Sequence, residues 1–428
     1  MAHLPSPVLL DGAADHGGLG RWSYLAVEPL ELLEGDAESW PAARDRIRDS
    51  FTPRRRGDDE PPFAGGWIGW LGYELGRAFD RQPVARGNRL AVPEYSLARH
   101  DAVVTWDHLR GKAWLAGENR TACEHLRRSL QGGSRLETGD SSAFSNLQSP
   151  ITILGGSTFS PDGYRAAVSA VIARILAGDI FQANLSQQFA VPFSGDPVAA
   201  YRALRERAPG SHAAYLARGA VTALSMSPEL FLRLDQQTRR VETRPIKGTR
   251  PRDGDPARDA ALAAELVASE KDRAENVMIV DLLRNDLNRV AKPGTVSVPA
   301  LCRLESFAAV HHLVSVVTAE LAPDRDALDL LAATFPGGSI TGAPKLRAMA
   351  ILAELEPERR GLYCGAIGWI GSDGGMELNV AIRTVTITHG VAVVPAGGGV
   401  TALSDPDAEY RETLDKARAL LEGLGAVA

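Results

Sequence analysis

The sequence contains little cysteine. Only Cys123, Cys302 and Cys364 occur in 428 residues, far apart and without a Cys-x-x-Cys pair. This excludes a disulfide framework and a thiolate metal site, and it fits a reducing compartment. No segment approaches the length of about 18 apolar residues that a membrane-spanning helix needs. The residues through Asp11 carry no Lys or Arg before a short apolar stretch, so we expect an untargeted cytoplasmic protein without a membrane span.

An excess of positive charge is also absent. The 47 Lys and Arg residues are outnumbered by 53 Asp and Glu residues, and the net charge is -6. No stretch combines a basic stripe with interleaved aromatic residues, so we do not expect a nucleic-acid partner. The chain has enough hydrophobic residues, 44%, to bury a large core, and it exceeds the length at which single cores usually divide. We expect two lobes and a small substrate.

A Gly-, Ser-, Thr- and Asn-rich segment divides the chain. Residues 132–157 have this composition and are predicted to form a linker. They separate an N-terminal lobe, residues 1–131, from a larger lobe, residues 158–428. In the N-terminal lobe, short apolar stretches alternate with Gly, Pro and charge clusters, which is typical of strands and short helices. The larger lobe begins with a predicted helix that has Ser160 as N-cap and ends at Gly178.

The larger lobe is predicted to mix strands with helices. Residues 229–244 resemble a hairpin, which leaves Lys247 in a loop just past a strand. Residues 334–355 fit a strand, a Gly-rich turn and a helix with Thr341 as N-cap. The remaining predictions are one long amphipathic helix over residues 259–287, strands over residues 363–370, 378–387 and 391–395, and a last helix over residues 406–424.

Two pairs of carboxylates have a spacing that places each pair on one helix face. Asp272 and Glu275 are three residues apart, and so are Glu409 and Glu412. Two such helices could converge on a hard divalent cation, and oxygen ligands without His or Cys favour Mg²⁺ over zinc. Spacing alone favours the simpler interpretation, which is two solvated acidic faces.

Two glycine clusters could bring backbone N–H groups close to a carboxylate. Residues 397–399 follow a predicted strand, and Gly337 and Gly338 precede a predicted helix. Such glycines more often form plain turns. The second cluster is not a nucleotide P-loop, because Ala343 stands where the lysine must be.

Lys247 lies in a basic stretch. Five arginines surround it in sequence, and their field favours the neutral, nucleophilic amine: Arg239, Arg240, Arg244, Arg250 and Arg252. Composition alone favours an ordinary surface lysine on a basic hairpin. His312 fits a structural core histidine as well as an acid or base, and Glu229 is ambiguous by itself.

A series of ordered motifs resembles the chorismate-utilising enzymes. This family contains the large subunits of anthranilate, aminodeoxychorismate, isochorismate and salicylate synthases. The motifs are Gly178-Asp179-Ile180-Phe181-Gln182-Ala183-Asn184-Leu185-Ser186, Ser227-Pro228-Glu229, the Lys247 loop, residues 275–287, His312-Leu313-Val314-Ser315, Gly342-Ala343-Pro344-Lys345, Ala381-Ile382-Arg383-Thr384 and residues 404–413.

The resemblance implies an α+β fold of two face-to-face, largely antiparallel sheets with helices outside, and a catalytic C-terminal lobe. It also implies that Glu275 and Glu412 bind Mg²⁺, with Asp272 and Glu409 beside them, and that the ion holds the ring carboxylate of chorismate. Further positions match residues of the family's active site. These are Tyr363, Arg383 and the backbone of Gly397, Gly398 and Gly399 for the enolpyruvyl group, Lys416 near the ring carboxylate, Thr341 near the ring, and His312 as the active-site histidine.

Two positions distinguish between reactions within the family. The anthranilate and isochorismate enzymes typically carry alanine at the position of Lys247, so lysine there resembles the aminodeoxychorismate synthases. Its amine would attack C2 and expel the 4-hydroxyl, with Glu229 as general acid, and ammonia would then attack C4 and expel the lysine. At the position of Gln182, the water-adding enzymes carry a lysine that acts as a base. A glutamine side chain cannot activate water in this way. We therefore expect 4-amino-4-deoxychorismate as the product, for para-aminobenzoate and folate biosynthesis.

The source of ammonia must lie outside the chain. None of its cysteines stands in a Gly-rich nucleophile turn like those of glutaminases, so we expect a separate glutamine amidotransferase subunit. Two other interpretations remain. The chain could be an anthranilate synthase large subunit with an atypical lysine, or a non-catalytic chorismate-binding subunit.

One element departs from the family pattern. Leu9-Leu10-Asp11-Gly12 resembles the Leu-Leu-Glu-Ser element of the family's tryptophan pocket, but glycine replaces the serine. The resemblance therefore does not carry tryptophan binding over to this chain.

Overall fold

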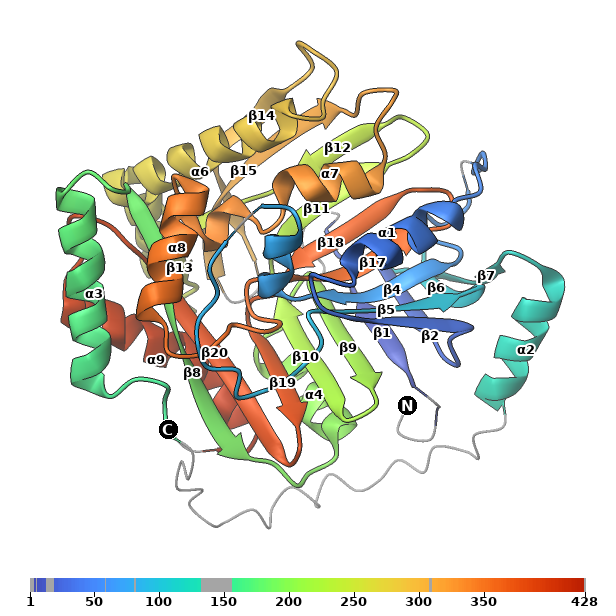
Figure 1. Ribbon diagram of the computed structural model, residues 1–428, viewed down its shortest axis with the longest axis horizontal. Helices are drawn as coiled ribbons and strands as arrows, with labels where there is room; N and C mark the ends of the chain where they lie inside the picture. The colour runs from blue at the N-terminus through green and yellow to red at the C-terminus, as the bar shows by residue number, and fades with distance from the viewer. Residues whose placement is uncertain are drawn as a thin grey trace.

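The computed structural model describes residues 4, 6–12, 19–57, 59–80, 82–131, 156–307 and 310–426. Its strands form two large sheets with helices around them (Figure 1). The pairings between named strands are antiparallel, and a cluster of buried side chains from both sheets packs between them. The fold class that the family resemblance implies is confirmed.

The first sheet contains ten strands and joins both ends of the chain. In spatial order these are β16 (Gly342–Ala343), β8 (Gln182–Pro192), β20 (Val391–Val400), β19 (Thr384–Thr388), β10 (Val221–Ser227), β9 (His212–Arg218), β1 (Val8–Asp11), β2 (Trp22–Ala26), β6 (Ala102–Asp107) and β7 (Lys112–Gly117).

The second sheet has a similar size. Its order is β13 (Ile246–Pro251), β15 (Val310–Glu320), β12 (Arg240–Thr243), β11 (Leu230–Asp235), β18 (Met376–Val380), β17 (Ala366–Gly371), β4 (Gly66–Leu71), β5 (Tyr95–His100) and β3 (Glu31–Gly35), and β14 (Ser297–Ser306) also pairs with β15.

Helices cover the outer faces of the sheets. Figure 1 shows α6 and α7 over the second sheet, and α3 and α9 beside β8 and β20. The described helices are α1 (Trp40–Asp49), α2 (Arg120–Gln131), α3 (Pro161–Leu176), α4 (Pro197–Arg207), α5 (Pro256–Ala268), α6 (Glu270–Asn288), α7 (Ala327–Thr334), α8 (Lys345–Leu355) and α9 (Pro406–Gly423), with the short 3-10 helices η1 (Tyr73–Ala78) and η3 (Gly338–Ile340). None of them has the length and apolar character of a membrane span.

Strands from the N-terminal part of the chain extend both sheets. In the first sheet β1 pairs with β9, and in the second sheet β4 pairs with β17. Residues 1–131 thus share continuous sheets with the residues after 158. The division into two lobes stays a prediction, and most of the predicted linker, residues 132–155, lies outside the described residues.

Several local predictions are confirmed. The Ser160 hydroxyl caps α3 by accepting the Gly163 N–H at 3.1 Å, and Gly178 after the helix has φ +81°. The 229–244 hairpin corresponds to β11 and β12, and the last helix corresponds to α9.

Other local predictions are wrong. The helix over residues 259–287 is two helices, because Ser269 is extended and its hydroxyl caps α6 by accepting the Asp272 N–H at 3.3 Å. Lys247 belongs to the strand β13, which pairs with β15 and is no loop. The strand over residues 378–387 is divided into β18 and β19, since Arg383 between them has φ +48°.

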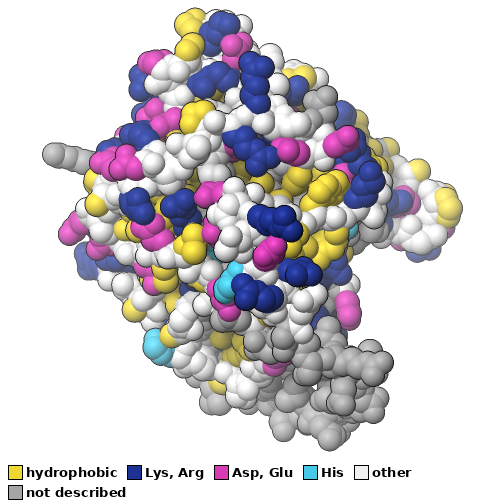
Figure 2. Space-filling model, turned by 90° about the vertical axis from the view of Figure 1, so that its right-hand side faces the viewer, with side chains coloured by type: hydrophobic (Ala, Val, Ile, Leu, Met, Phe, Trp, Pro, Cys, Tyr) yellow, Lys and Arg dark blue, Asp and Glu magenta, His cyan; other side chains and the backbone are white. Residues whose placement is uncertain are grey.

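Charges of both signs share the surface. On the face shown in Figure 2, Lys and Arg side chains are interspersed with Asp and Glu among the described residues. This face has no continuous basic surface of the kind that would neutralise a nucleic-acid backbone.

A buried ion pair connects the N-terminal part of the chain to the part after residue 158. The Arg360 guanidinium, which is almost fully buried, donates to both carboxylate oxygens of Glu356, to the Asn184 carbonyl on β8 and to the Ile340 carbonyl in η3. It also lies over the Tyr73 ring at 4.5 Å. Since Tyr73 comes from the N-terminal part of the chain, this one side chain contacts both parts.

We expect Arg360→Ala to lower the free energy of unfolding by about 3–5 kcal/mol, because it leaves the buried Glu356 carboxylate without its counter-ion. Arg418→Ala is the matched control, since its pair with Asp415 is exposed, and it should change stability by less than about 0.5 kcal/mol. Urea unfolding of the two variants measures the difference. Equal stability of both would contradict this role of Arg360.

Candidate active site

The pairing of β8 with β20 forms the floor of the candidate site. Gly398 and Gly399 on β20 lie opposite Leu185 and Asn184. A Cβ atom at Gly398 would lie 2.9 Å from Glu409 Oε2. A Cβ atom at Gly399 would lie 2.1 Å from Gln182 Nε2 and 3.5 Å from Glu275 Oε2. The missing side chains therefore let carboxylates of α6 and α9 approach the strand backbone.

The three carboxylates Glu275, Glu409 and Glu412 differ in their electrostatics. Burial raises the pKa of Glu275, and the negative charges of Asp272 and Glu409 act in the same direction. Burial also raises the pKa of Glu409, to which Glu412 adds. Burial disfavours the charged form of Glu412 too, but Lys416, 2.6 Å away, holds the pKa of that carboxyl below its usual value. Each of the first two would gain from a nearby cation.

These carboxylates fit a hard cation such as Mg²⁺. Glu409 Oε2 is buried and has no hydrogen-bond partner among the described residues, while its Oε1 accepts the Ser404 hydroxyl at 2.7 Å. Asp272 lies 3.5 Å from Arg250 and is thus paired with a cation of the protein. Within residues 156–307 and 310–426, no three His, Cys, Asp or Glu side chains already form a metal-binding cluster. Binding of Mg²⁺ by Glu275, Glu409 and Glu412 would therefore require these side chains to move closer together.

Lys247 faces this group of carboxylates from β13. Its charge lowers the pKa of Glu229, of Glu275 and of Glu412 against the effect of burial. The five arginines near Lys247 in sequence do not surround it with unpaired positive charge as expected, because each of them is paired with another group. These are the carbonyls of Leu321, Ala322 and Arg325 for Arg239, and the carboxylates of Glu242, Glu305, Glu265 and Asp259 for Arg240, Arg244, Arg250 and Arg252.

Glu229 lies between β10 and β11 and is 4% exposed. Its Oε1 accepts the Ser339 hydroxyl at 2.7 Å. Burial raises the pKa of Glu229 to about 7, although the Ser339 hydroxyl and the charge of Lys247 oppose this. A carboxyl group with such a pKa can donate a proton near neutral pH.

His312 and Thr341 are both buried. His312 Nδ1 lies 2.8 Å from the hydroxyl of Thr249, two residues after Lys247 on β13, so the ring is held beside the lysine strand. The Thr341 hydroxyl donates to the Gly337 carbonyl at 3.0 Å. The prediction of Thr341 as N-cap is wrong, since α8 has Pro344 in that place without a side-chain cap.

Arg383 and Lys416 are the other positively charged residues predicted for this site. Burial lowers the pKa of Arg383, and no ion pair or hydrogen bond to its guanidinium is found within the described ranges. Lys416 donates to the Gly397 carbonyl at 2.9 Å and thereby anchors α9 to β20. An anionic ligand is the natural partner for the arginine. Tyr363 is buried in the large apolar core of the second sheet, and burial raises its pKa well above the usual value.

Sequence reasoning missed several groups that hold these residues. Ser339 contacts Glu229, Thr249 contacts His312, and Ser404 contacts Glu409. Lys271 lies 3.9 Å from Glu409. Ser339 and Ser404 stand inside or beside the quoted motifs, and this position could have identified them as candidates. Thr249 could not be found in this way, because it contacts His312 only through the pairing of β13 with β15.

Comparison with known proteins identifies the family. Residues 13–422 match the family of chorismate binding enzymes. Anthranilate synthase component 1 of Streptomyces coelicolor is 40% identical over 96% of this chain and 82% of its own length. The chain belongs to the chorismate-binding enzyme family. Aminodeoxychorismate synthase component 1 of Escherichia coli is 39% identical over 99% of this chain and 94% of its own length.

A solved structure of the same family supports the fold. Anthranilate synthase component I from Streptococcus pneumoniae is similar with a TM-score of 0.80 and 30% identity, over 94% of this chain and 92% of that chain. The relatives carry the names of two different reactions at nearly equal identity, so the family is established and the comparisons do not select a member of it.

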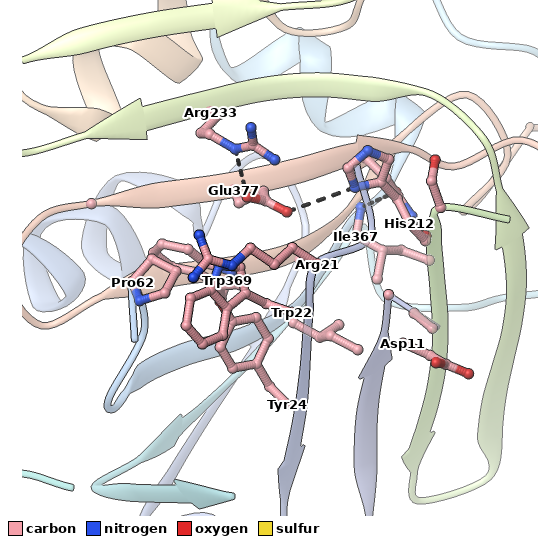
Figure 3. A pocket seen from close by; sticks show the side chains of 18 of the residues that line it. Asp11, Arg21, Trp22, Tyr24, Pro62, His212, Arg233, Ile367, Trp369 and Glu377 are labelled. Atoms are coloured by element: carbon pink, nitrogen blue, oxygen red, sulfur yellow. Dashed lines mark hydrogen bonds and ion pairs between the residues drawn. The ribbon is translucent and has the colours of Figure 1, made fainter. Parts of the chain in front are cut away.

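A cavity of about 290 Å³ lies between the sheets of this chorismate-binding enzyme, apart from the candidate site (Figure 3). Leu10, Asp11 and Gly12 line it together with aromatic rings such as Trp22 and Trp369. A Cβ atom at Gly12 would lie 2.3 Å from the Trp22 carbonyl oxygen, so this backbone has no room for the serine found in the family's tryptophan element. The local packing thus requires glycine at position 12, where the family's tryptophan element has serine.

We expect Mg²⁺ to raise the Tm of the wild-type chain, because the ion would relieve repulsion between partly buried carboxylates. Glu275→Gln should remove most of this stabilisation, since it removes an anionic ligand. Glu422→Gln, on the same helix as Glu412 but paired with Arg207, serves as a control that keeps the response. Thermal unfolding with and without Mg²⁺ measures the effect. An equal rise in the Glu275 variant would exclude Glu275 as a ligand.

Proposed function

We propose that this chain is the chorismate-aminating component of an aminodeoxychorismate synthase, which converts chorismate and ammonia to 4-amino-4-deoxychorismate. The observation that carries the proposal is the position of Lys247. Its amine stands on β13 within electrostatic reach of the buried acid Glu229 and of the carboxylates Glu275 and Glu412. A nucleophile and a general acid thus share one site.

The first displacement uses Lys247 and Glu229. The neutral amine of Lys247 forms a bond to C2 of chorismate, the ring double bonds shift, and the bond between C4 and the hydroxyl oxygen breaks. Glu229 gives its proton to this oxygen, which leaves as water. The raised pKa of Glu229 supports this role, because a carboxyl with the usual pKa would be ionised at neutral pH.

The second displacement uses ammonia. Ammonia forms a bond to C4, the double bonds shift back, and the bond between C2 and the lysine nitrogen breaks. The lysine leaves as an amine after protonation, so the nitrogen of the product comes from ammonia. We propose that a separate glutamine amidotransferase supplies it, as the component 1 names of the relatives suggest.

Binding of chorismate requires positive groups for two carboxylates. The guanidinium of Arg383, which has no partner among the described residues, supports a contact with the enolpyruvyl carboxylate, and the Gly397–Gly399 backbone gives that group access to β20. Bound Mg²⁺ would neutralise the ring carboxylate and the charge that develops as the hydroxyl leaves. Glu275, Glu409 and Glu412 would hold the ion.

Anthranilate synthesis is the second candidate. The near-equal identity to an anthranilate synthase component 1 favours it as much as the leading proposal. It would have ammonia attack C2 directly and leave Lys247 without a chemical role. A non-catalytic chorismate-binding subunit would not need Glu229 buried as a protonated acid.

Product identity under Mg²⁺ and ammonium tests the proposal. With chorismate, we expect the wild-type chain to form 4-amino-4-deoxychorismate, which keeps its enolpyruvyl group, as identified by liquid chromatography and mass spectrometry. Lys247→Ala should abolish this product or redirect the enzyme to C2 amination. Lys292→Ala is a matched control, because this lysine pairs with Glu320 at the surface, and it should leave the product unchanged. Anthranilate and pyruvate from the wild-type chain would refute the proposal.

The pH dependence follows from Glu229. Its pKa of about 7 lies above its ordinary value of 4.5, and only the protonated form donates. kcat/KM should therefore fall about tenfold per pH unit once the pH exceeds the pKa of this group. Glu229→Gln should lower kcat by about 10²–10⁴-fold and remove this alkaline limb from the remaining activity. An unchanged limb in that variant would assign it to another group.

A further inference from the structure

Ser339 meets Glu229 through one specific contact. It stands in η3, directly after the Gly337-Gly338 turn, and is 7% exposed. Its hydroxyl donates to Glu229 Oε1 at 2.7 Å. The Glu229 backbone is fixed separately, because its N–H donates to the Ser227 hydroxyl at 3.3 Å and its carbonyl accepts the Val380 N–H at 3.0 Å. The serine thus orients the carboxyl group of Glu229 and does not fix its backbone.

The contact favours one carboxyl oxygen as the site of the proton. The carbonyl oxygen of a neutral carboxyl group is a better acceptor than its hydroxyl oxygen, so a serine hydroxyl donated to Oε1 favours the transferable proton on Oε2. The other groups that face Glu229 come from β13, namely the charge of Lys247 and the backbone N–H of Ile246. Both also favour the ionised form, as the serine does.

We propose that Ser339 is a positioning residue, which holds Glu229 by Oε1 so that Oε2 carries the proton that the departing hydroxyl receives. This inference rests on the proposed function only through the general-acid role of Glu229. It does not depend on Lys247, because amination at C2 also expels the 4-hydroxyl.

Removal of the hydroxyl should have two effects. First, kcat should fall by about 10- to 100-fold while KM for chorismate changes little, because the acid loses its orientation. Second, the alkaline limb of kcat/KM should move to higher pH by about 0.5 unit or more, because the ionised form of Glu229 loses a hydrogen bond. A purely structural serine would move neither the limb nor the balance between kcat and KM.

The test compares three variants of Ser339 in the full-length chain with chorismate, Mg²⁺ and ammonium. Ser339→Ala removes the hydroxyl. Ser339→Cys fills a similar volume with a weak donor and should keep most of the defect, whereas Ser339→Thr keeps the hydroxyl and should restore the wild-type limb. Ser96→Ala is the matched control. Ser96 is fully buried and donates to Glu34 Oε1 at 2.7 Å in the β3–β5 part of the second sheet, so its loss should leave the pH profile unchanged.

The outcomes separate the two proposals. A Ser339→Ala profile that coincides with that of the wild type, or a Ser339→Cys enzyme with full activity, would overturn the positioning role. Anthranilate as the wild-type product would overturn C4 amination alone, and the shifted limb would then still support Ser339. A wild-type chain that leaves chorismate unchanged would overturn both.

Discussion

The candidate site depends on the pairing of β8 with β20. Ten consecutive residue pairs, from Val391 opposite Pro192 to Val400 opposite Ala183, fix the register of these strands. This register places Gly398 and Gly399 beneath the carboxylates of α6 and α9, where any side chain would collide with Glu409 or Gln182. The buried Arg360 donates to the Asn184 carbonyl on β8 and so connects the same strand to the rest of the fold. The pairing of β8 with β20 therefore determines where the acidic side chains of the site can lie.

Differences in burial give similar side chains different roles. Glu229 is enclosed and has a pKa of about 7, so it is partly protonated near neutral pH. Glu412 is half exposed beside Lys416, and its pKa lies below the usual value. Lys247 acts electrostatically on both. Under the proposed function, one site would combine a proton donor, an anionic group for a cation, and an amine that acts on both.

The sequence was sufficient for the family and the fold class, because both rest on motifs that extend over most of the chain. Local boundaries were less certain. The hydrophobic pattern continues through Ser269, although the backbone is extended there and the Ser269 hydroxyl caps the second helix. The arginines near Lys247 are close in sequence, but the partner of Arg244, Glu305, lies 61 residues further along the chain. The contact between Ser339 and Glu229 spans 110 residues, and no local pattern encodes such a pair.

The central claim is that the Lys247 amine bonds to the substrate. The most direct test is intact-protein mass spectrometry after incubation with chorismate and Mg²⁺ in the absence of ammonia. The account predicts a species heavier by the mass of chorismate less one water, with the added mass located on the peptide that contains Lys247. A turnover-competent enzyme that shows no adduct, or an adduct on another residue, would contradict it.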